Sequence, residues 1–160
     1  FWLEIPLFTG DPSGKIEPLD VKEELGTGDP VAFSKEHTVL YVEDNPDNLR
    51  LMEMIIKRLD GFALVSSHNA MLGIELAKTT RPDIIILDIN LPGMSGYAAL
   101  NELQALTVTR DIPVIALSAN AMPRDIEKGL EAGFLRYLTK PVNVDEVTSA
   151  IREITSDDPA

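Results

Sequence analysis

The sequence predicts an α/β fold in which a parallel sheet carries helices on both of its faces. Two observations lead to this prediction. After residue 37, short hydrophobic runs alternate with segments of helical periodicity up to the end of the chain. The runs are nearly continuous in Val, Ile, Leu and aromatic residues, as expected of strands that are buried on both sides. Alternating strands and helices of this length form a doubly wound parallel sheet.

The predicted strands are short apolar runs bounded by turn residues or by residues that begin helices. Glu43, Asp88 and Ser118 each directly follow one of these runs. In order, the predicted strands are Thr38–Val42, Phe62–Ser66, Asp83–Leu87, Pro113–Leu117 and Phe134–Leu138.

The segments between these strands have the features of helices. Asn45 can cap a helix that has Pro46 at its first position, and Asn143 can cap the last helix. An apolar stripe at helical spacing marks the first helix, and it consists of Leu49, Met52, Ile56 and Leu59. We expect Met52, Met54 and Met71 to pack on helix faces. The predicted helices are Pro46–Leu59, Ala70–Thr79, Gly96–Leu106, Pro123–Glu131 and Val144–Ile154.

The composition changes near residue 37, which predicts three parts. Residues 1–10 contain an extended hydrophobic segment, Phe1–Leu7, that is too short to fold alone. Residues 11–36 are rich in Pro, Gly, Asp and Glu and are interpreted as a linker. Residues 37–157 form the predicted domain. Because the sequence does not begin with Met, we expect it to be part of a longer protein.

Composition and charge exclude several functions. The 160 residues carry a formal net charge of -12, which argues against direct nucleic-acid binding. No stretch is long and apolar enough for a membrane span, so we expect no membrane contact by this chain. The sequence has no cysteine, which fits a reducing compartment, and we expect a cytoplasmic location.

Charged and polar side chains stand where the predicted strands stop: Glu43, Asp44, Asp88, Ser118 and Lys140. Parallel neighbouring strands share their carboxyl edge, so these side chains should gather there. Three carboxylates repel one another unless a cation or a proton intervenes. The set therefore predicts a bound metal ion and a phosphoryl group.

Each of these residues has an expected role in phosphoryl chemistry. Asp88 is placed to act as the nucleophile toward phosphorus. Glu43 and Asp44 offer hard oxygen ligands for Mg²⁺, and the backbone carbonyl of Asn90 can complete its coordination. A hydrogen bond from Ser118 and the charge of Lys140 can stabilise the phosphoryl oxygens.

Simpler interpretations exist for the same residues. Asp88 can cap the turn that follows it, because Asp is common at the start of loops. Glu43 and Asp44 can interact with the dipole of the next helix. Lys140 can be an ordinary surface lysine, and Tyr137 an ordinary core aromatic residue.

Four segments together resemble the receiver domain of bacterial two-component response regulators, over about residues 37–155. They are LYVEDNPDN, DIIILDINLPGMSGY, PVIALSAN and YLTKP. The resemblance implies a flavodoxin-like (βα)5 sandwich with strand order 2-1-3-4-5, an order that is also known from flavodoxin and related proteins. It implies a cis peptide bond before Pro141.

The resemblance also implies roles for the site residues. Asp88 would be the phosphoacceptor and Lys140 the lysine of the active site. Ser118 would be the switch hydroxyl and Tyr137 the switch aromatic residue. A Mg²⁺ or Mn²⁺ ion would be held by Glu43, Asp44, Asp88 and the Asn90 carbonyl. Phosphorylation would bias the face formed by the fourth helix, the fifth strand and the fifth helix.

The opening segment Phe1–Leu7 resembles the closing strand of the ATP-binding domain of sensor histidine kinases. Together with a linker and a receiver, it predicts the C-terminal receiver of a hybrid sensor histidine kinase. The implied partners are a histidine kinase core as phosphodonor and a histidine phosphotransfer protein as acceptor, and a weak homodimer is possible. His37 and His68 have no phosphoacceptor histidine box around them, and we expect both at the surface.

Other function classes stay open at this stage. A stand-alone single-domain response regulator would act through protein–protein contacts. An aspartyl-phosphate phosphatase or mutase usually has a second aspartate two residues after its nucleophile, where this chain has Asn90. A receiver-like interaction domain that has lost phosphorylation would not need the acidic pair. A nucleotide-binding flavodoxin-like domain would need a Gly-rich loop after the first strand.

Overall fold

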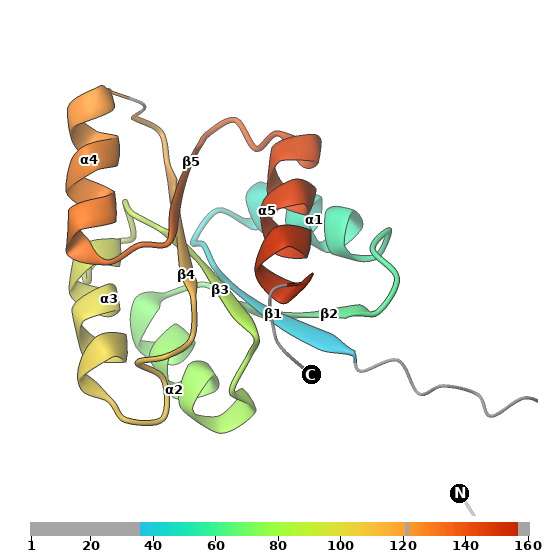
Figure 1. Ribbon diagram of the computed structural model, residues 1–160, viewed down its shortest axis with the longest axis horizontal. Coiled ribbons are helices and arrows are strands. Elements are labelled where there is room, and N and C mark those ends of the chain that lie inside the picture. The colour runs from blue at the N-terminus through green and yellow to red at the C-terminus, as the bar shows by residue number, and fades with distance from the viewer. Residues whose placement is uncertain (1–35, 121, 157–160) are drawn as a thin grey trace, which may run out of the picture. The chain divides into compact units, whose positions relative to one another are not determined.

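A computed structural model of the protein describes residues 36–120 and 122–156. In this part of the chain five parallel strands alternate with five helices (Figure 1). The strands are β1 (His37–Val42), β2 (Phe62–Ser67), β3 (Ile84–Asp88), β4 (Val114–Ser118) and β5 (Arg136–Thr139). The helices are α1 (Pro46–Ile56), α2 (Ala70–Thr80), α3 (Gly96–Ala105), α4 (Pro123–Ala132) and α5 (Val144–Ser156).

The strand order is β2-β1-β3-β4-β5, which confirms the predicted flavodoxin-like topology. The Lys140–Pro141 peptide bond is cis, as the family resemblance implied. The segments 1–10 and 11–36, interpreted as a strand remnant and a linker, lie outside the described residues. Among the described residues, every helix is too short or too polar to span a bilayer.

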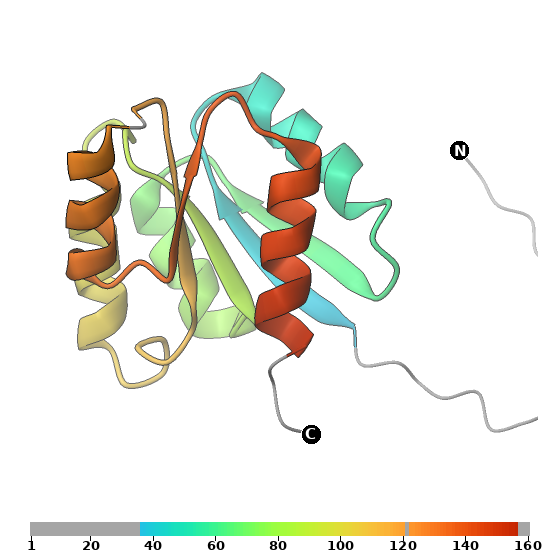
Figure 2. The ribbon, with the colours of Figure 1, turned by 45° about the horizontal axis from the view of Figure 1, so that its top comes forward.

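The helices α1 and α5 cover one face of the sheet, and α2, α3 and α4 cover the other (Figure 2). An apolar cluster on each face holds the helices against the sheet. Side chains alternate between the two sides along each strand, so neighbouring residues of one strand belong to different clusters. In β1, Leu40 faces α2 and α3, whereas Val39 and Tyr41 face α1 and α5. The strands β3 and β4 are buried along their whole length, which explains their continuous apolar sequence.

Some boundaries differ from those predicted, for local physical reasons. The helix α1 ends at Ile56, three residues early, because the chain tightens into hydrogen bonds from Arg58 to Ile55 and from Leu59 to Ile56. Leu59 nevertheless stays buried in the core. Asp88 and Ser118 are the last residues of β3 and β4, where we predicted the strands to stop one residue earlier.

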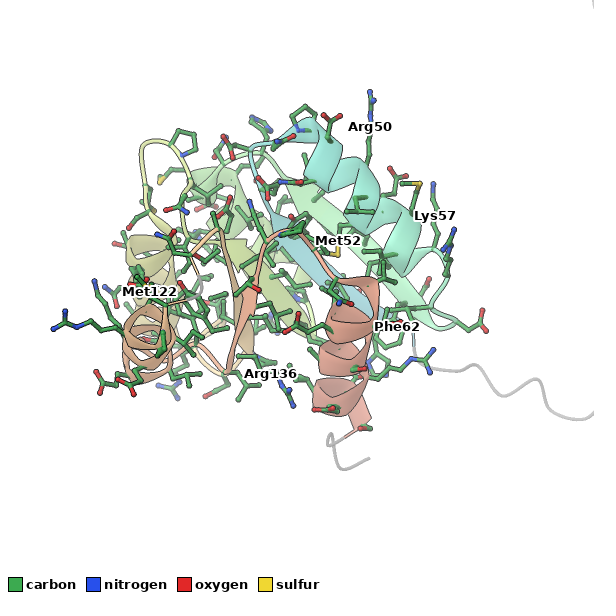
Figure 3. The ribbon with its side chains drawn as sticks, turned by 90° about the horizontal axis from the view of Figure 1, so that it is seen from above. Arg50, Met52, Lys57, Phe62, Met122 and Arg136 are labelled. Carbon is green, nitrogen blue, oxygen red and sulfur yellow. The ribbon has the colours of Figure 1, made fainter. Side chains whose placement is uncertain are left out.

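The prediction that the methionines pack on helix faces is right for one of the three. Met52 is completely buried between α1 and the sheet, whereas Arg50 and Lys57 point away from α1 (Figure 3). Met54 is 55% exposed, because two residues along a helix turn a side chain to nearly the opposite side. Met71, in the first turn of α2, is 62% exposed.

The register of the sheet sets the ends of the strands level with one another. Val42 pairs with Leu87, so Glu43 and Asp88 follow directly at the same edge. The loop after β3 returns tightly, and the Gly96 N–H donates to the Ile89 carbonyl over 2.9 Å. A Cβ atom at Gly96 would lie 2.5 Å from the Asp88 carbonyl oxygen, so only glycine permits this close return.

Candidate functional site

The carboxyl edge of the sheet gathers the acidic residues that the sequence analysis selected. Oxygens of Glu43, Asp44 and Asp88 lie within 4.8 Å of one another. Glu43 is only 1% exposed and Asp88 2%, whereas Asp44 is exposed to solvent. Such a set of anions requires positive charge nearby, because burial makes their mutual repulsion more costly.

The Lys140 ammonium provides that positive charge. Its Nζ lies 2.7 Å from Glu43 Oε2 and 2.8 Å from Asp88 Oδ2. Lys140 comes directly after β5, and its backbone N–H donates to the Ser118 carbonyl over 2.7 Å. Burial by itself would lower the pKa of Lys140, but its hydrogen bonds to Asp88 and Glu43 raise this pKa above the ordinary value.

Glu43 accepts hydrogen bonds from four groups. Its Oε2 receives the Tyr41 hydroxyl at 2.9 Å, the Asn48 side-chain amide at 3.1 Å and Lys140. Its Oε1 receives the Asn45 backbone N–H at 3.1 Å. Burial opposes ionisation, but the hydrogen bonds from Lys140, Asn45 and Tyr41 together lower the pKa of Glu43. The carboxylate is therefore the stable form in this pocket.

Sequence reasoning missed two of these donors, Tyr41 and Asn48. The signal for Tyr41 was available, because residues two apart on a strand point to the same face and Tyr41 stands two before Glu43. Asn48 lies in the first turn of α1 and can be placed only once the direction of that helix is known. Burial, and then the charge of Glu43, raises the pKa of Tyr41, so its hydroxyl stays protonated.

Asp88 has a donor at each oxygen. Its Oδ2 faces Lys140, and its Oδ1 accepts the backbone N–H of Asn90 over 2.9 Å. Asn90 is exposed and follows β3 by two residues, in the position where its carbonyl was expected to serve as a metal ligand. Asp88 is thus held in one orientation by a donor in its own loop, the Asn90 N–H, and by Lys140, which is distant in sequence.

Ser118 is buried at the end of β4, the strand that lies next to β3 in the sheet. Its hydroxyl oxygen accepts the backbone N–H of Asn120 over 3.1 Å. Ser118 pairs with Thr139 in the register, which places Lys140 one residue further along the same edge. The structure thus brings Ser118 and Lys140 to the edge where Glu43 and Asp88 lie.

Tyr137 lies in β5 and is half-buried against α4. A Cβ atom at Gly129 would come within 2.5 Å of its ring, so this glycine leaves the space that the ring occupies. Tyr97, at the start of α3, hydrogen-bonds Tyr137; burial and the proximity of Tyr137 both raise the pKa of Tyr97. Phe134 packs edge-on against Tyr97 with ring centroids 5.6 Å apart. Tyr137 therefore joins an aromatic group between α3 and α4.

The two histidines differ in their environment. His68 is exposed, as expected. His37 was also expected at the surface but is half-buried, because its ring lies 5.3 Å from that of Phe62. Its Nδ1 is 3.6 Å from Asp83 Oδ1. His37 begins β1 and thus lies at the opposite end of the strand from Glu43.

The donor set fits a small, hard divalent cation. Glu43, Asp44 and Asp88 bring carboxylate oxygens, which are the ligands that Mg²⁺ takes in proteins. Asp44 is exposed, so water can complete the coordination of an ion beside it.

Comparison with known protein families shows which family the chain belongs to. The sequence model described as "Response regulator receiver domain" matches residues 39–152. The chain belongs to this family. Receiver domains are the modules of two-component signalling that interact with histidine kinases or phosphotransfer proteins, and they bind Mg²⁺ in an acidic pocket.

The relatives of this receiver domain differ in how much of their own length the match covers. It is 34% identical over 120 residues to the polar-differentiation response regulator DivK of Brucella anthropi, covering 75% of this chain and 97% of DivK. It is 36% identical over 116 residues to the transcriptional regulatory protein CseB of Streptomyces coelicolor, covering 72% of this chain. The match spans only 48% of CseB.

Two similar solved structures are receiver domains of histidine kinases. One, from a sensor histidine kinase of Pseudomonas aeruginosa, has a magnesium ion coordinated in its active site cleft. It is 33% identical, with a TM-score of 0.69, and the match covers 76% of this chain and 98% of that one. The other, from Syntrophus aciditrophicus, is 30% identical with a TM-score of 0.69, covering 78% and 94%.

The lowered pKa of Glu43 predicts how the stability of the metal-free receiver domain depends on pH. The ordinary pKa of a glutamate side chain is 4.5, and the pKa of Glu43 in the folded protein is lower. As the pH falls, Glu43 therefore takes up a proton in the unfolded chain before it does so in the folded protein. The stability from Glu43 is present above about pH 4.5 and is lost as the pH falls through the folded pKa. We expect the free energy of unfolding to fall more steeply below pH 4.5 in wild type than in Glu43→Gln.

Urea denaturation in EDTA at several pH values measures this difference. Glu127→Gln is a matched control, because Glu127 is exposed on α4, and it should keep the wild-type slope. Equal slopes for wild type and Glu43→Gln would contradict the ionised, hydrogen-bonded state of Glu43.

Proposed function

We propose that Asp88 accepts a phosphoryl group from a phosphohistidine and that this modification carries the signal of the domain. The observation that supports this most strongly is the position of Asp88. It is a buried carboxylate at the end of β3, held by Lys140 and by the Asn90 N–H beside two further acidic residues. A carboxylate fixed in this way is suited to nucleophilic attack on phosphorus.

The transfer needs only one bond to form and one to break. An oxygen of Asp88 bonds to phosphorus while the bond between phosphorus and the donor histidine nitrogen breaks. The bonding electron pair stays on the imidazole, which takes a proton from solvent. Since the leaving group is supplied by the donor, the chain's own residues orient and stabilise charge, which is the main task in phosphoryl transfer.

Lys140 and Ser118 are the proposed stabilising groups of the chain. The Lys140 ammonium already contacts Asp88 Oδ2 and remains next to any phosphoryl group added there. Ser118 accepts a hydrogen bond through its oxygen, so its own hydrogen can be donated to a phosphoryl oxygen. Both act on charge that grows at the phosphoryl oxygens during transfer.

We propose that Glu43, Asp44, Asp88 and the Asn90 carbonyl hold Mg²⁺ (or Mn²⁺). The close approach of the three carboxylates supports this assignment. A divalent cation bound there supplies positive charge to the phosphoryl oxygens and so favours their approach to Asp88. Lys140 keeps two of the carboxylates, Glu43 and Asp88, oriented toward the pocket.

Ser118 and Tyr137 are the proposed switch residues. A new hydrogen bond from Ser118 to the phosphoryl group would alter the loop after β4, where Asn120 is its present partner. That loop leads into α4, against which Tyr137 packs at Gly129. Phosphorylation would thereby select between two packings of the surface formed by α4, β5 and α5.

Two protein contexts fit such a domain. A hybrid sensor histidine kinase is supported by the likeness to two kinase receivers and by the resemblance of Phe1–Leu7 to a kinase strand. In that context residues 11–36 are a linker, residues 37–157 form the receiver, the phosphodonor is a kinase core, and the acceptor is a histidine phosphotransfer protein. A stand-alone regulator is favoured by the match over 97% of DivK.

The sequence upstream of Phe1 distinguishes these contexts. A histidine box and an ATP-binding region there would support the hybrid kinase, whereas their absence would exclude it. Both contexts place the phosphodonor in the cytoplasm, which is the location we propose for this domain. The phosphoacceptor role of Asp88 is the same in both.

Replacing Asp88 by Asn should abolish phosphorylation, because an amide is a much weaker nucleophile than a carboxylate. We expect incubation with acetyl phosphate and Mg²⁺ to add one phosphoryl group to wild type and none to Asp88→Asn, as measured by intact-protein mass spectrometry. Asp111→Asn, a change at an exposed aspartate, is the control and should label like wild type. Equal labelling of wild type and Asp88→Asn would contradict the proposal.

Replacing Asp44 by Ala should weaken Mg²⁺ binding at least several-fold, since it removes an anionic oxygen ligand. Isothermal titration with MgCl₂ measures the dissociation constant directly. Asp47→Ala removes the same charge from the exposed first turn of α1 and serves as the control. A Mg²⁺ affinity that is lowered equally by both changes would indicate a general charge effect and reject the site.

A further inference from the structure

We propose that Tyr41 is a positioning residue for the metal site, because its hydroxyl fixes the orientation of the Glu43 carboxylate. The inference rests on the proposed Mg²⁺ site and adds a residue from inside the core to it. Tyr41 is completely buried in β1, a strand with neighbours on both sides. Its ring belongs to the apolar cluster under α1 and α5, which also contains Met52.

A buried phenol needs a hydrogen-bond partner, and here that partner is the acidic pocket. The Tyr41 hydroxyl donates to Glu43 Oε2 over 2.9 Å, and both residues are almost without solvent contact. Tyrosine and glutamate stand two apart, so the strand itself aims both side chains to the same face. The core and the site are therefore joined by one hydrogen bond.

The distribution of donors over Glu43 gives its two oxygens different roles. Oε2 receives three donors, from Tyr41, Asn48 and Lys140, which saturates its lone pairs. Oε1 receives only the Asn45 backbone N–H and keeps a lone pair. Oε1 is therefore the oxygen available to a cation or to a water bound to it. The rotation of the carboxylate decides whether this oxygen is presented.

Of the three donors to Oε2, Tyr41 is the most rigidly held. Lys140 is a long side chain that divides its ammonium between Glu43 and Asp88. Asn48 is half-buried near the helix surface. The ring of Tyr41 is enclosed by apolar side chains, so its hydroxyl has a fixed position. Outer groups that orient ligands in this way commonly change metal affinity or activity by about 10–100-fold when they are removed.

Tyr41→Phe tests the inference, because it removes the hydroxyl and keeps the ring that fills the core. We expect the dissociation constant for Mg²⁺ in isothermal titration to rise about tenfold. Tyr97→Phe is the matched control: the Tyr97 hydroxyl pairs with Tyr137 and not with Glu43, so Mg²⁺ affinity should not change.

Making the Tyr41→Phe change in the Glu43→Gln variant as well distinguishes a positioning role of Tyr41 from a general effect on folding. If Tyr41 acts through Glu43, then Tyr41→Phe should weaken Mg²⁺ binding in wild type but have no further effect in Glu43→Gln. Two results would overturn the inference: wild-type affinity in Tyr41→Phe, or an equal loss in both backgrounds. In either case the proposed function stands as long as Asp44→Ala weakens binding. If the wild-type protein bound no Mg²⁺, both the proposed Mg²⁺ site and the positioning role of Tyr41 would be overturned.

Discussion

The Lys140 ammonium lies between two buried carboxylates, Glu43 and Asp88, and the architecture of the acidic edge depends on this contact. Without it, the parallel strands would bring negative charges together in a place that water barely reaches. The contact joins the strand ends of β1, β3 and β5, which are far apart in the sequence. The Lys140 ammonium contacts Glu43 and Asp88 and not the exposed Asp44. The negative charge of Asp44 is therefore left to attract a divalent cation to the acidic edge.

The strands hold this arrangement because their apolar residues are packed on both faces. Two clusters anchor β1 and β3 from opposite sides, so the polar residues that end these strands have little freedom. Tyr41 also restricts the motion of Glu43 in the pocket, because its hydroxyl donates a hydrogen bond to Glu43 from within the core. The loop after β3 is equally constrained, because Gly96 lies against the Asp88 backbone. A site built this way is preorganised by the fold rather than by flexible loops.

Much of this could be predicted from the sequence. Every predicted strand and helix is present, because continuous apolar runs and helical periodicity are local signals. The gathering of Glu43, Asp88 and Lys140 also follows, since parallel strands must share an edge. The end of α1, the exposure of Met54 and the partial burial of His37 depend on tertiary contacts that no local pattern encodes. The same holds for the donors Tyr41 and Asn48 and for the space that Gly129 leaves for Tyr137.

The central claim is that the Lys140 ammonium offsets the repulsion within the acidic edge, and the unfolding free energy of Lys140→Met with and without Mg²⁺ tests it most directly. In metal-free buffer we expect Lys140→Met to lose about 3 kcal/mol of unfolding free energy, which is the lower end of the range for breaking a buried ion pair. Lys57→Met breaks only the exposed pair with Glu53, which solvent screens, so it should reduce the unfolding free energy far less than Lys140→Met does. Adding Mg²⁺ should stabilise Lys140→Met more than wild type, because the cation then meets uncompensated carboxylates. Two results together would contradict the claim: Lys140→Met loses no more unfolding free energy than Lys57→Met, and Mg²⁺ raises the unfolding free energy of Lys140→Met by the same amount as that of wild type.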